Sequence, residues 1–151
     1  MTLETRVKNT WLEKRGSDRE EIGRLLALAD GRLEDYRRAT AGKLSADVQL
    51  GLAYDVIRIS ATAALRAAGY RVVRGGGEHY RTIEALEFSI DPQKKRLIPT
   101  LDKLRKKRNT GSYDDFGLVS QGEADSCGKM AVRVRKEVED WIRKNHADKI
   151  G

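Results

Sequence analysis

The sequence predicts an all-α protein, a single domain folded as an antiparallel bundle of about five to six helices. Proline occurs only at Pro92 and Pro99, so long stretches lack the residue that interrupts helices. Between the glycine-containing breaks, apolar residues recur three and four positions apart, as in a helix, instead of alternating as in a strand. The chain has 151 residues without an internal repeat, a length that fits one domain spanning residues 1–151.

Two helices are predicted before residue 42. The first is a short amphipathic helix within residues 1–16. Its apolar residues lie four positions apart: Leu3, Val7 and Trp11. The second helix is expected over about residues 18–41, with apolar residues on one face and charges on the other. Ser17 is well placed to cap its start, and Gly42 is expected to end it.

A third helix of about 22 residues is predicted to follow, with Ser45 or Asp47 as its N-cap. Its apolar residues form two stripes. One contains Val48, Leu52, Val56, Ile59 and Ala63, and the other contains Ala53, Ile57, Ala61, Ala64 and Ala68. A helix that is apolar on two faces is expected at the buried centre of the fold. Residues 70–79, which include three consecutive glycines, are predicted to form an irregular loop, in preference to a phosphate cradle.

The second half predicts three more helical segments. One spans about residues 79–90, with Ile83, Leu86 and Ile90 facing inward. A basic helix runs from Pro92 to about Asn109, with Pro99 marking either a kink or the true start. The last helix begins at a capping-box pattern, Ser120 to Glu123. Its apolar seam has spacings of four and three: Cys127, Ala131, Val134, Val138 and Trp141.

Positive charge is concentrated in one segment. The net charge is +7, and residues 93–108 contain eight basic residues against the single acid Asp102, a surplus of seven that equals the net charge of the chain. The basic residues are Lys94, Lys95, Arg96, Lys103, Arg105, Lys106, Lys107 and Arg108. Such a face is often only a solvated surface, but its concentration and its lack of aromatic residues favour phosphate contacts without base stacking.

Several function classes are disfavoured. A single cysteine, Cys127, permits no intrachain disulfide, and two histidines without a ligand pattern predict no metal site and no cofactor. The stretch poorest in charge, residues 48–64, still contains Asp55 and Arg58 and is not expected to span a membrane. The chain start lacks the apolar core of a signal peptide, so we expect cytoplasmic residence.

Arg108 occupies an unusual position on the basic helix. The apolar row Leu97, Leu101 and Leu104 continues at the same spacing to Arg108, which places this guanidinium on the core-facing side. One interpretation is an arginine that extends to solvent at a helix end and complements the helix dipole. The other is an arginine held at a groove or a subunit interface, next to Asn109 and a polar loop.

The run Leu104-Arg-Lys-Lys-Arg-Asn-Thr-Gly-Ser-Tyr-Asp114 resembles the signature region of the HEPN superfamily, the higher eukaryotes and prokaryotes nucleotide-binding domains. Its members are small helical bundles in which an arginine, usually followed by a polar residue, precedes a histidine by four to six positions. The run Ala67-Ala-Gly-Tyr70, the residues Gly77-Glu-His79 and the run Ile83-Glu-Ala-Leu86 also look like a bacterial branch of this superfamily. The resemblance covers about residues 46–141.

In active members, the resemblance implies metal-independent RNA cleavage at a composite site between two protomers. Arg108 matches the family's arginine and Asn109 its polar residue, but Tyr113 stands where the histidine is expected. A phenol with an ordinary pKa near 10 is a poor general base at neutral pH compared with imidazole. The candidate catalytic residues are therefore Arg108, Asn109 and Tyr113, with His79 as an auxiliary group.

Three hypotheses follow. The first is a HEPN-like module, weakly active or inactive as a nuclease, that binds RNA or a nucleotide through Arg108, Asn109 and six nearby basic residues. These are Lys94, Lys95, Lys103, Arg105, Lys106 and Lys107. The second is an active ribonuclease of the toxin or phage-defence type. The third is an interaction module whose basic helix docks an acidic partner, such as a nucleotidyltransferase-type antitoxin. The apolar seams and the resemblance both predict a homodimer.

Overall fold

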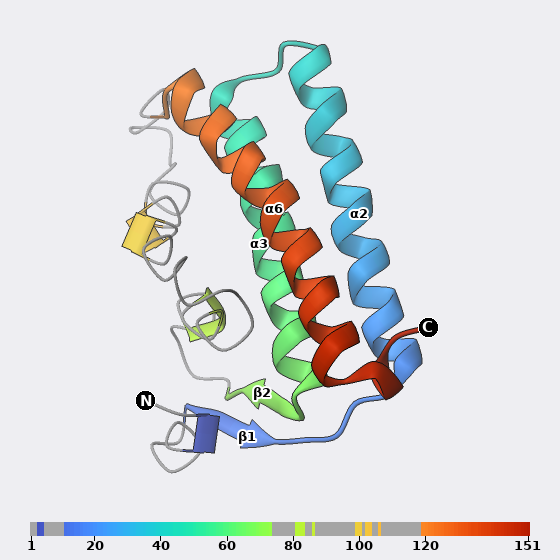
Figure 1. The fold of residues 1–151 in the computed structure, drawn as a ribbon. Helices are drawn as coiled ribbons and strands as arrows, with labels where there is room; N and C mark the ends of the chain where they lie inside the picture. Colours follow the sequence, from blue (N-terminus) through green and yellow to red (C-terminus); the bar gives the residue numbers. More distant parts are fainter. Residues whose placement is uncertain are drawn as a thin grey trace.

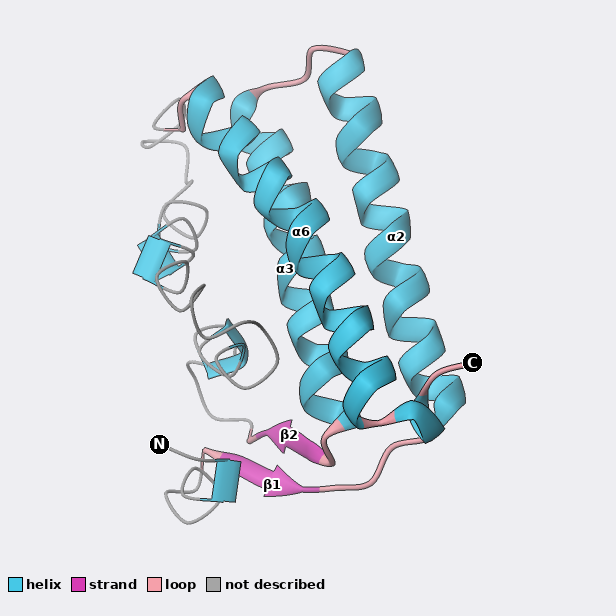
Figure 2. Cartoon of the chain, viewed as in Figure 1, coloured by secondary structure: helices cyan, strands magenta, loops and turns pink. Residues whose placement is uncertain are grey.

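The computed structural model describes residues 3–4, 11–73, 81–83, 86, 99–100, 102–103, 106 and 119–151. The main elements are three long helices and a small two-stranded sheet: β1 (Leu12–Lys14), α2 (Arg19–Ala41), α3 (Ala46–Ala67), β2 (Tyr70–Val72) and α6 (Gln121–Asn145). A short 3-10 helix, η4 (Ala147–Lys149), follows them. The described chain is therefore mostly helical, which confirms the predicted class (Figure 2).

Helix α3 packs against both α2 and α6 and shares one hydrophobic core with them. Figure 1 shows that α2 runs opposite to α3, whereas α6 runs in the same direction as α3. The α2–α3 pair is antiparallel because a short turn joins the two helices. The α3–α6 pair is parallel because the long connection between Ala67 and Gln121 returns the chain to the same end of the molecule. Within the described residues, no helix is both long and apolar enough to cross a membrane.

Helix α2 matches the predicted span, but its N-cap is one residue later than expected. The side chain of Asp18 accepts a hydrogen bond from the Glu21 backbone N–H at 2.8 Å, which satisfies one of the free donors of the first turn. Ser17 has another partner, because its hydroxyl donates to the Arg66 carbonyl of α3 at 2.6 Å. Gly42 ends the helix as predicted: its N–H donates to the carbonyl of Arg38, and the N–H of Lys43 donates to the carbonyl of Thr40.

Helix α3 forms the predicted buried centre, with 22 residues and Ser45 as its N-cap. Both apolar stripes lie largely in the core, which explains why this helix carries so few charges. The prediction for the first stripe is wrong at its start, because Val48 is 45% exposed in the first turn of the helix. Gln49 is buried there instead, and its amide donates to the Leu44 carbonyl at 2.7 Å.

Helix α6 begins at the predicted capping box, in which Ser120 and Glu123 each accept a hydrogen bond from the other residue's backbone N–H. Four residues of the predicted seam are fully buried, from Cys127 to Val138. At the last position the prediction is wrong. Ile142 is fully buried, whereas Trp141 is only partly buried, because an ideal helix drifts away from a strict 3.5-residue repeat.

The two-stranded sheet corrects two predictions. Residues 12–14, expected within the N-terminal helix, form β1, and the predicted loop after Gly69 begins with β2. The strands pair antiparallel, with Leu12 opposite Val72 and Lys14 opposite Tyr70. Gly69 adopts a positive φ of 92°, a conformation that suits glycine, and allows the chain to turn from α3 into β2.

The predicted fourth helix and the basic helix lie mostly outside the described residues. Residues 81–83 are helical, and Ile83 and Leu86 are buried as expected. Of the basic segment, the described residues are Pro99, Thr100, Asp102, Lys103 and Lys106, and all of them are helical. Ile90 and the choice between a kink and a start at Pro99 also fall outside the described residues.

Candidate anion-binding pocket

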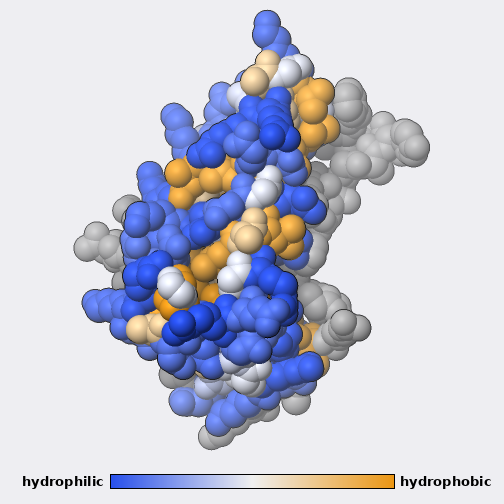
Figure 3. Space-filling model, turned by 90° about the vertical axis from the view of Figure 1, so that its right-hand side faces the viewer, coloured by the Kyte–Doolittle hydropathy of each residue, from blue (hydrophilic) through white to orange (hydrophobic). Residues whose placement is uncertain are grey.

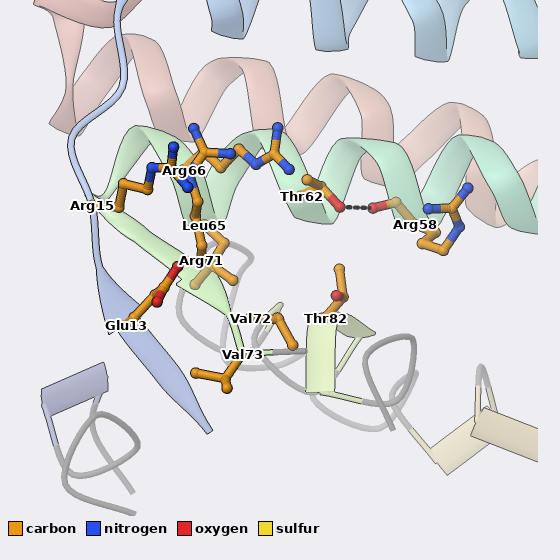
Figure 4. Close-up of a pocket in the computed structure, with 10 residues that line it drawn as sticks. All are labelled: Glu13, Arg15, Arg58, Thr62, Leu65, Arg66, Arg71, Val72, Val73 and Thr82. Atoms are coloured by element: carbon orange, nitrogen blue, oxygen red, sulfur yellow. Dashed lines mark hydrogen bonds between the residues drawn. The ribbon is translucent and has the colours of Figure 1, made fainter. Parts of the chain in front are cut away.

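A pocket of about 780 Å³ lies between α3 and the two-stranded sheet. Figure 4 shows α3 along one side, β1 and β2 on another, and Thr82 approaching from a third. Its lining is Glu13, Arg15, Arg58, Thr62, Leu65, Arg66, Arg71, Val72, Val73 and Thr82. Four of these ten residues are arginines, so the chemistry of the pocket is dominated by guanidinium groups.

Helix α3 contributes a polar row to the pocket wall. Arg58, Thr62 and Arg66 are four residues apart and therefore share a face of the helix. Eight residues separate the two arginines, a rise of about 12 Å along the helix axis. Asp55 lies 3.7 Å from Arg58, measured from Oδ1 to Nη2. The Thr62 hydroxyl donates to the Arg58 carbonyl at 2.9 Å, which leaves the arginines as the main donors of this wall.

The sheet brings two more arginines and a carboxylate to the same pocket. Glu13 of β1 lies opposite Arg71 of β2 in the strand register. Arg15 follows β1 directly, and its backbone N–H donates to the Gly69 carbonyl at 2.8 Å, which continues the pairing beyond the strands. In Figure 4, Arg15, Arg66 and Arg71 gather at one end of the pocket, and Arg58 lies at the other end beyond Thr62.

Glu21 of α2 is shared by two of these arginines. Its Oε1 lies 3.1 Å from Nη1 of Arg66 and also accepts from Nη2 of Arg71. All three side chains are largely buried, with exposed fractions of 17%, 30% and 20% for Glu21, Arg66 and Arg71. The carboxylate therefore joins α2, α3 and β2, and it neutralises one positive charge where two are present.

The electrostatics at this end are governed by crowded positive charge. Burial lowers the pKa of Arg66 below its ordinary value, and the charges of Arg71 and Arg15 lower it further, although Glu21 opposes them. A group whose protonated form is disfavoured by neighbouring cations lies in a positive field. An anion that entered this pocket would relieve that repulsion.

Some donors in the pocket have no acceptor. Nε of Arg58 and Nε of Arg71 are buried and have no hydrogen-bond partner in the described part of the chain. Arg15 is exposed, and it forms no ion pair with a described residue. Because buried polar groups are normally hydrogen-bonded, these donors favour a ligand with several acceptor oxygens.

The described residues offer little for other chemistry. They contain no group of three or more histidine, cysteine, aspartate or glutamate side chains able to hold a metal ion. Cys127 lies in the core, and burial raises the pKa of its thiol to about 12, which suppresses the nucleophilic thiolate. The arrangement is suited to binding an anion.

The predicted site falls largely outside the described residues. Lys103 and Lys106 are described and exposed, and Nζ of Lys106 lies 3.3 Å from Oδ2 of Asp102. The remaining predicted site residues lie outside the described parts of the chain: Arg108, Asn109, Tyr113, Lys94, Lys95, Arg105, Lys107 and His79.

The sequence reasoning did not identify the arginine pocket. One signal was available, because Arg58, Thr62 and Arg66 interrupt a strongly apolar helix at a regular spacing of four. The contributions of Arg15 and Arg71 had no such signal, since they depend on the pairing of two strands that are far apart in the chain.

Comparison with known proteins gives no match: no family model, no curated protein and no solved structure is similar to this chain at a significant level. The resemblance to the HEPN superfamily therefore stays a prediction.

Proposed function

We propose that this chain is a HEPN-like helical domain, a bundle of about five to six helices in which α2 runs antiparallel to α3 and α6, and that it binds the phosphates of RNA or of a nucleotide. The observation that supports the proposal is the convergence of four arginines on one pocket. Guanidinium groups keep their charge at neutral pH and offer paired donors that match phosphate oxygens. The basic residues between 93 and 108 would add further phosphate contacts.

The test is a binding titration of a labelled single-stranded RNA at several salt concentrations. We expect log-linear weakening with salt, and a slope that falls by about 0.7 for each phosphate contact removed from a single strand. Arg66→Gln should weaken binding by about tenfold or more, since a charge-assisted hydrogen bond contributes roughly 1.5–3 kcal/mol. Lys103→Gln and Lys106→Gln test the basic segment in the same way.

The matched control is Arg37→Gln. Arg37 lies near the other end of α2 and is 60% exposed, and its one ion pair with a described residue joins it to Glu34 at 3.8 Å. The Arg37→Gln substitution removes the same charge as Arg66→Gln and should leave RNA affinity nearly unchanged. Affinity that ignores salt, or that falls equally in the Arg37 and Arg66 variants, would contradict the proposal.

We propose a homodimer as the assembly. Large apolar side chains are exposed on the described surface, and Figure 3 shows apolar patches among the hydrophilic side chains of one face. The exposed residues are Leu28, Leu44, Val48 and Val132. Sedimentation should show an association that depends on protein concentration, and a monomer at every concentration would rule the dimer out.

A further inference from the structure

The arginine pocket contains more positive charge and more hydrogen-bond donors than the ion pairs with Glu21 use. Glu21 already joins α2 to α3 and β2 through Arg66 and Arg71. Arg15 adds a third positive charge to this end, and its charge acts on Arg66. The buried Nε atoms of Arg58 and Arg71 add donors without acceptors in the described residues. All four arginines line the pocket, so the surplus charge and the unpartnered donors favour an anionic ligand there.

The number of donors favours one kind of phosphate. An internal phosphodiester has a single negative charge and two free oxygens. A terminal phosphate monoester has three free oxygens and close to two negative charges at neutral pH. Arg15, Arg66 and Arg71 match the monoester better, because they offer donors for a third oxygen and their positive charge exceeds the negative charge of Glu21 and Glu13.

The rest of the lining indicates what is attached to that phosphate. Leu65, Val72 and Val73 form an apolar part of the wall, which a free inorganic anion does not need. Leu65 is only 5% exposed and packs with Leu12 in a small hydrophobic cluster under the sheet, so packing fixes the position of this part of the wall. The flat face of a nucleobase would gain from contact with this apolar wall.

Glu13 indicates a hydroxyl donor. Its carboxylate lines the pocket and forms no ion pair with a described residue. A carboxylate accepts hydrogen bonds and repels phosphate, so its natural partner on a nucleotide is a ribose hydroxyl. A pocket of about 780 Å³ lies in the usual size range of small-ligand sites.

We propose that this pocket binds a terminal ribonucleotide that carries a phosphate monoester, with the arginines on the phosphate, the apolar wall on the base and Glu13 on a ribose hydroxyl. The inference rests on the proposed function and narrows it from phosphate binding in general to a phosphorylated end. The same chemistry occurs in a free nucleotide and at the end of an RNA strand.

The experiment uses the full chain and short oligoribonucleotides of one sequence that carry a 5′-phosphate, a 3′-phosphate or hydroxyls at both ends. We expect one phosphorylated strand to bind about tenfold or more tightly than the hydroxyl strand. Arg15→Gln should remove most of this preference, and Arg37→Gln should keep it. Arg15 has no described ion pair to lose, so its variant is expected to melt like the wild type.

Two further arms identify the ligand. A DNA strand with the same terminal phosphate should bind more weakly than the RNA, and Glu13→Gln should narrow that difference without removing the phosphate preference. The four ribonucleoside 5′-monophosphates are then used as competitors. Competition at a similar affinity supports a free nucleotide as the ligand, and weak competition supports an RNA end.

Equal binding of all three RNA strands to the wild type, or a preference that Arg15→Gln leaves intact, would overturn the inference. If the strands bind equally but with a salt dependence that Arg66→Gln reduces, the proposed function survives and only the end recognition fails. If no strand and no nucleotide binds, both fail.

Discussion

The close approach of α2 and α6 at Gly128 leads to a sharp stability prediction. A methyl group at Gly128 would lie 2.7 Å from Cε1 of Tyr36, and closer still to the ring's Cζ and Oη. Carbon atoms pack best at about 3.5–4.0 Å, so the ring would have to withdraw by more than about 1 Å. Overpacking of this kind costs about 1–3 kcal/mol, whereas replacing glycine by alanine in a helix gains up to about 1 kcal/mol. We expect Gly128→Ala to destabilise the protein by up to about 2 kcal/mol.

Gly31→Ala is the control, because a methyl group at Gly31 in α2 meets nothing within 4 Å. It should stabilise the fold by up to about 1 kcal/mol. Urea unfolding followed by circular dichroism measures both variants, and a 2 kcal/mol difference moves the midpoint by about 1 M. Adding Tyr36→Leu to Gly128→Ala should remove most of the stability loss, since the ring that the methyl group meets is then absent. The steric reasoning is refuted if Gly128→Ala stabilises the protein as much as Gly31→Ala does.

Three further predictions concern the core, the helix ends and an ion pair between helices. Cys127 should not react with a thiol reagent at pH 8 until urea unfolds the chain, because burial raises its pKa to about 12. The unfolded thiol ionises from about pH 9, whereas the buried thiol stays protonated to about pH 12, so the contribution of Cys127 to stability is complete below pH 9 and falls as the pH rises toward 12. The stability of the wild type relative to Cys127→Ala should therefore decline over that range. An unchanged difference would contradict this. Gln49→Leu removes the amide that donates to the Leu44 carbonyl, and should cost about 1–3 kcal/mol in urea unfolding, a value near zero being the adverse result. Asp30→Asn breaks the paired contacts of 2.9 and 3.0 Å with Arg135, yet it should cost at most about 1 kcal/mol, less at high salt, because Asp30 is exposed; a larger loss would show that the pair is stronger than surface ion pairs usually are.

The helices were predictable because their signals are local and repeated. The apolar spacing of α3 and of α6 marks the faces that enter the core, and Ser120 with Glu123 marks a helix start within four residues. Errors arose at the ends. Ser17 was a sound cap by residue type, but its hydroxyl bonds to Arg66, a partner brought near only by folding.

The sheet was not predictable by the same reasoning. Its strands have three residues each, too few to show an alternating pattern, and neither would be stable alone. Their pairing depends on Leu12 and Val72 meeting across the end of α3. The positions of Arg15 and Arg71 in the pocket depend on the same strand pairing, and so does the ion pair of Glu21 with Arg71.

The sequence by itself determined the helical class, the buried faces of α2, α3 and α6, and the row Arg58, Thr62 and Arg66, because these follow from the period of a helix. Only the tertiary structure decided that a second set of charged residues faces this row. Charge attraction and strand pairing act between distant parts of the chain, and no local pattern records them. The arginine pocket exists because two short strands close the end of α3.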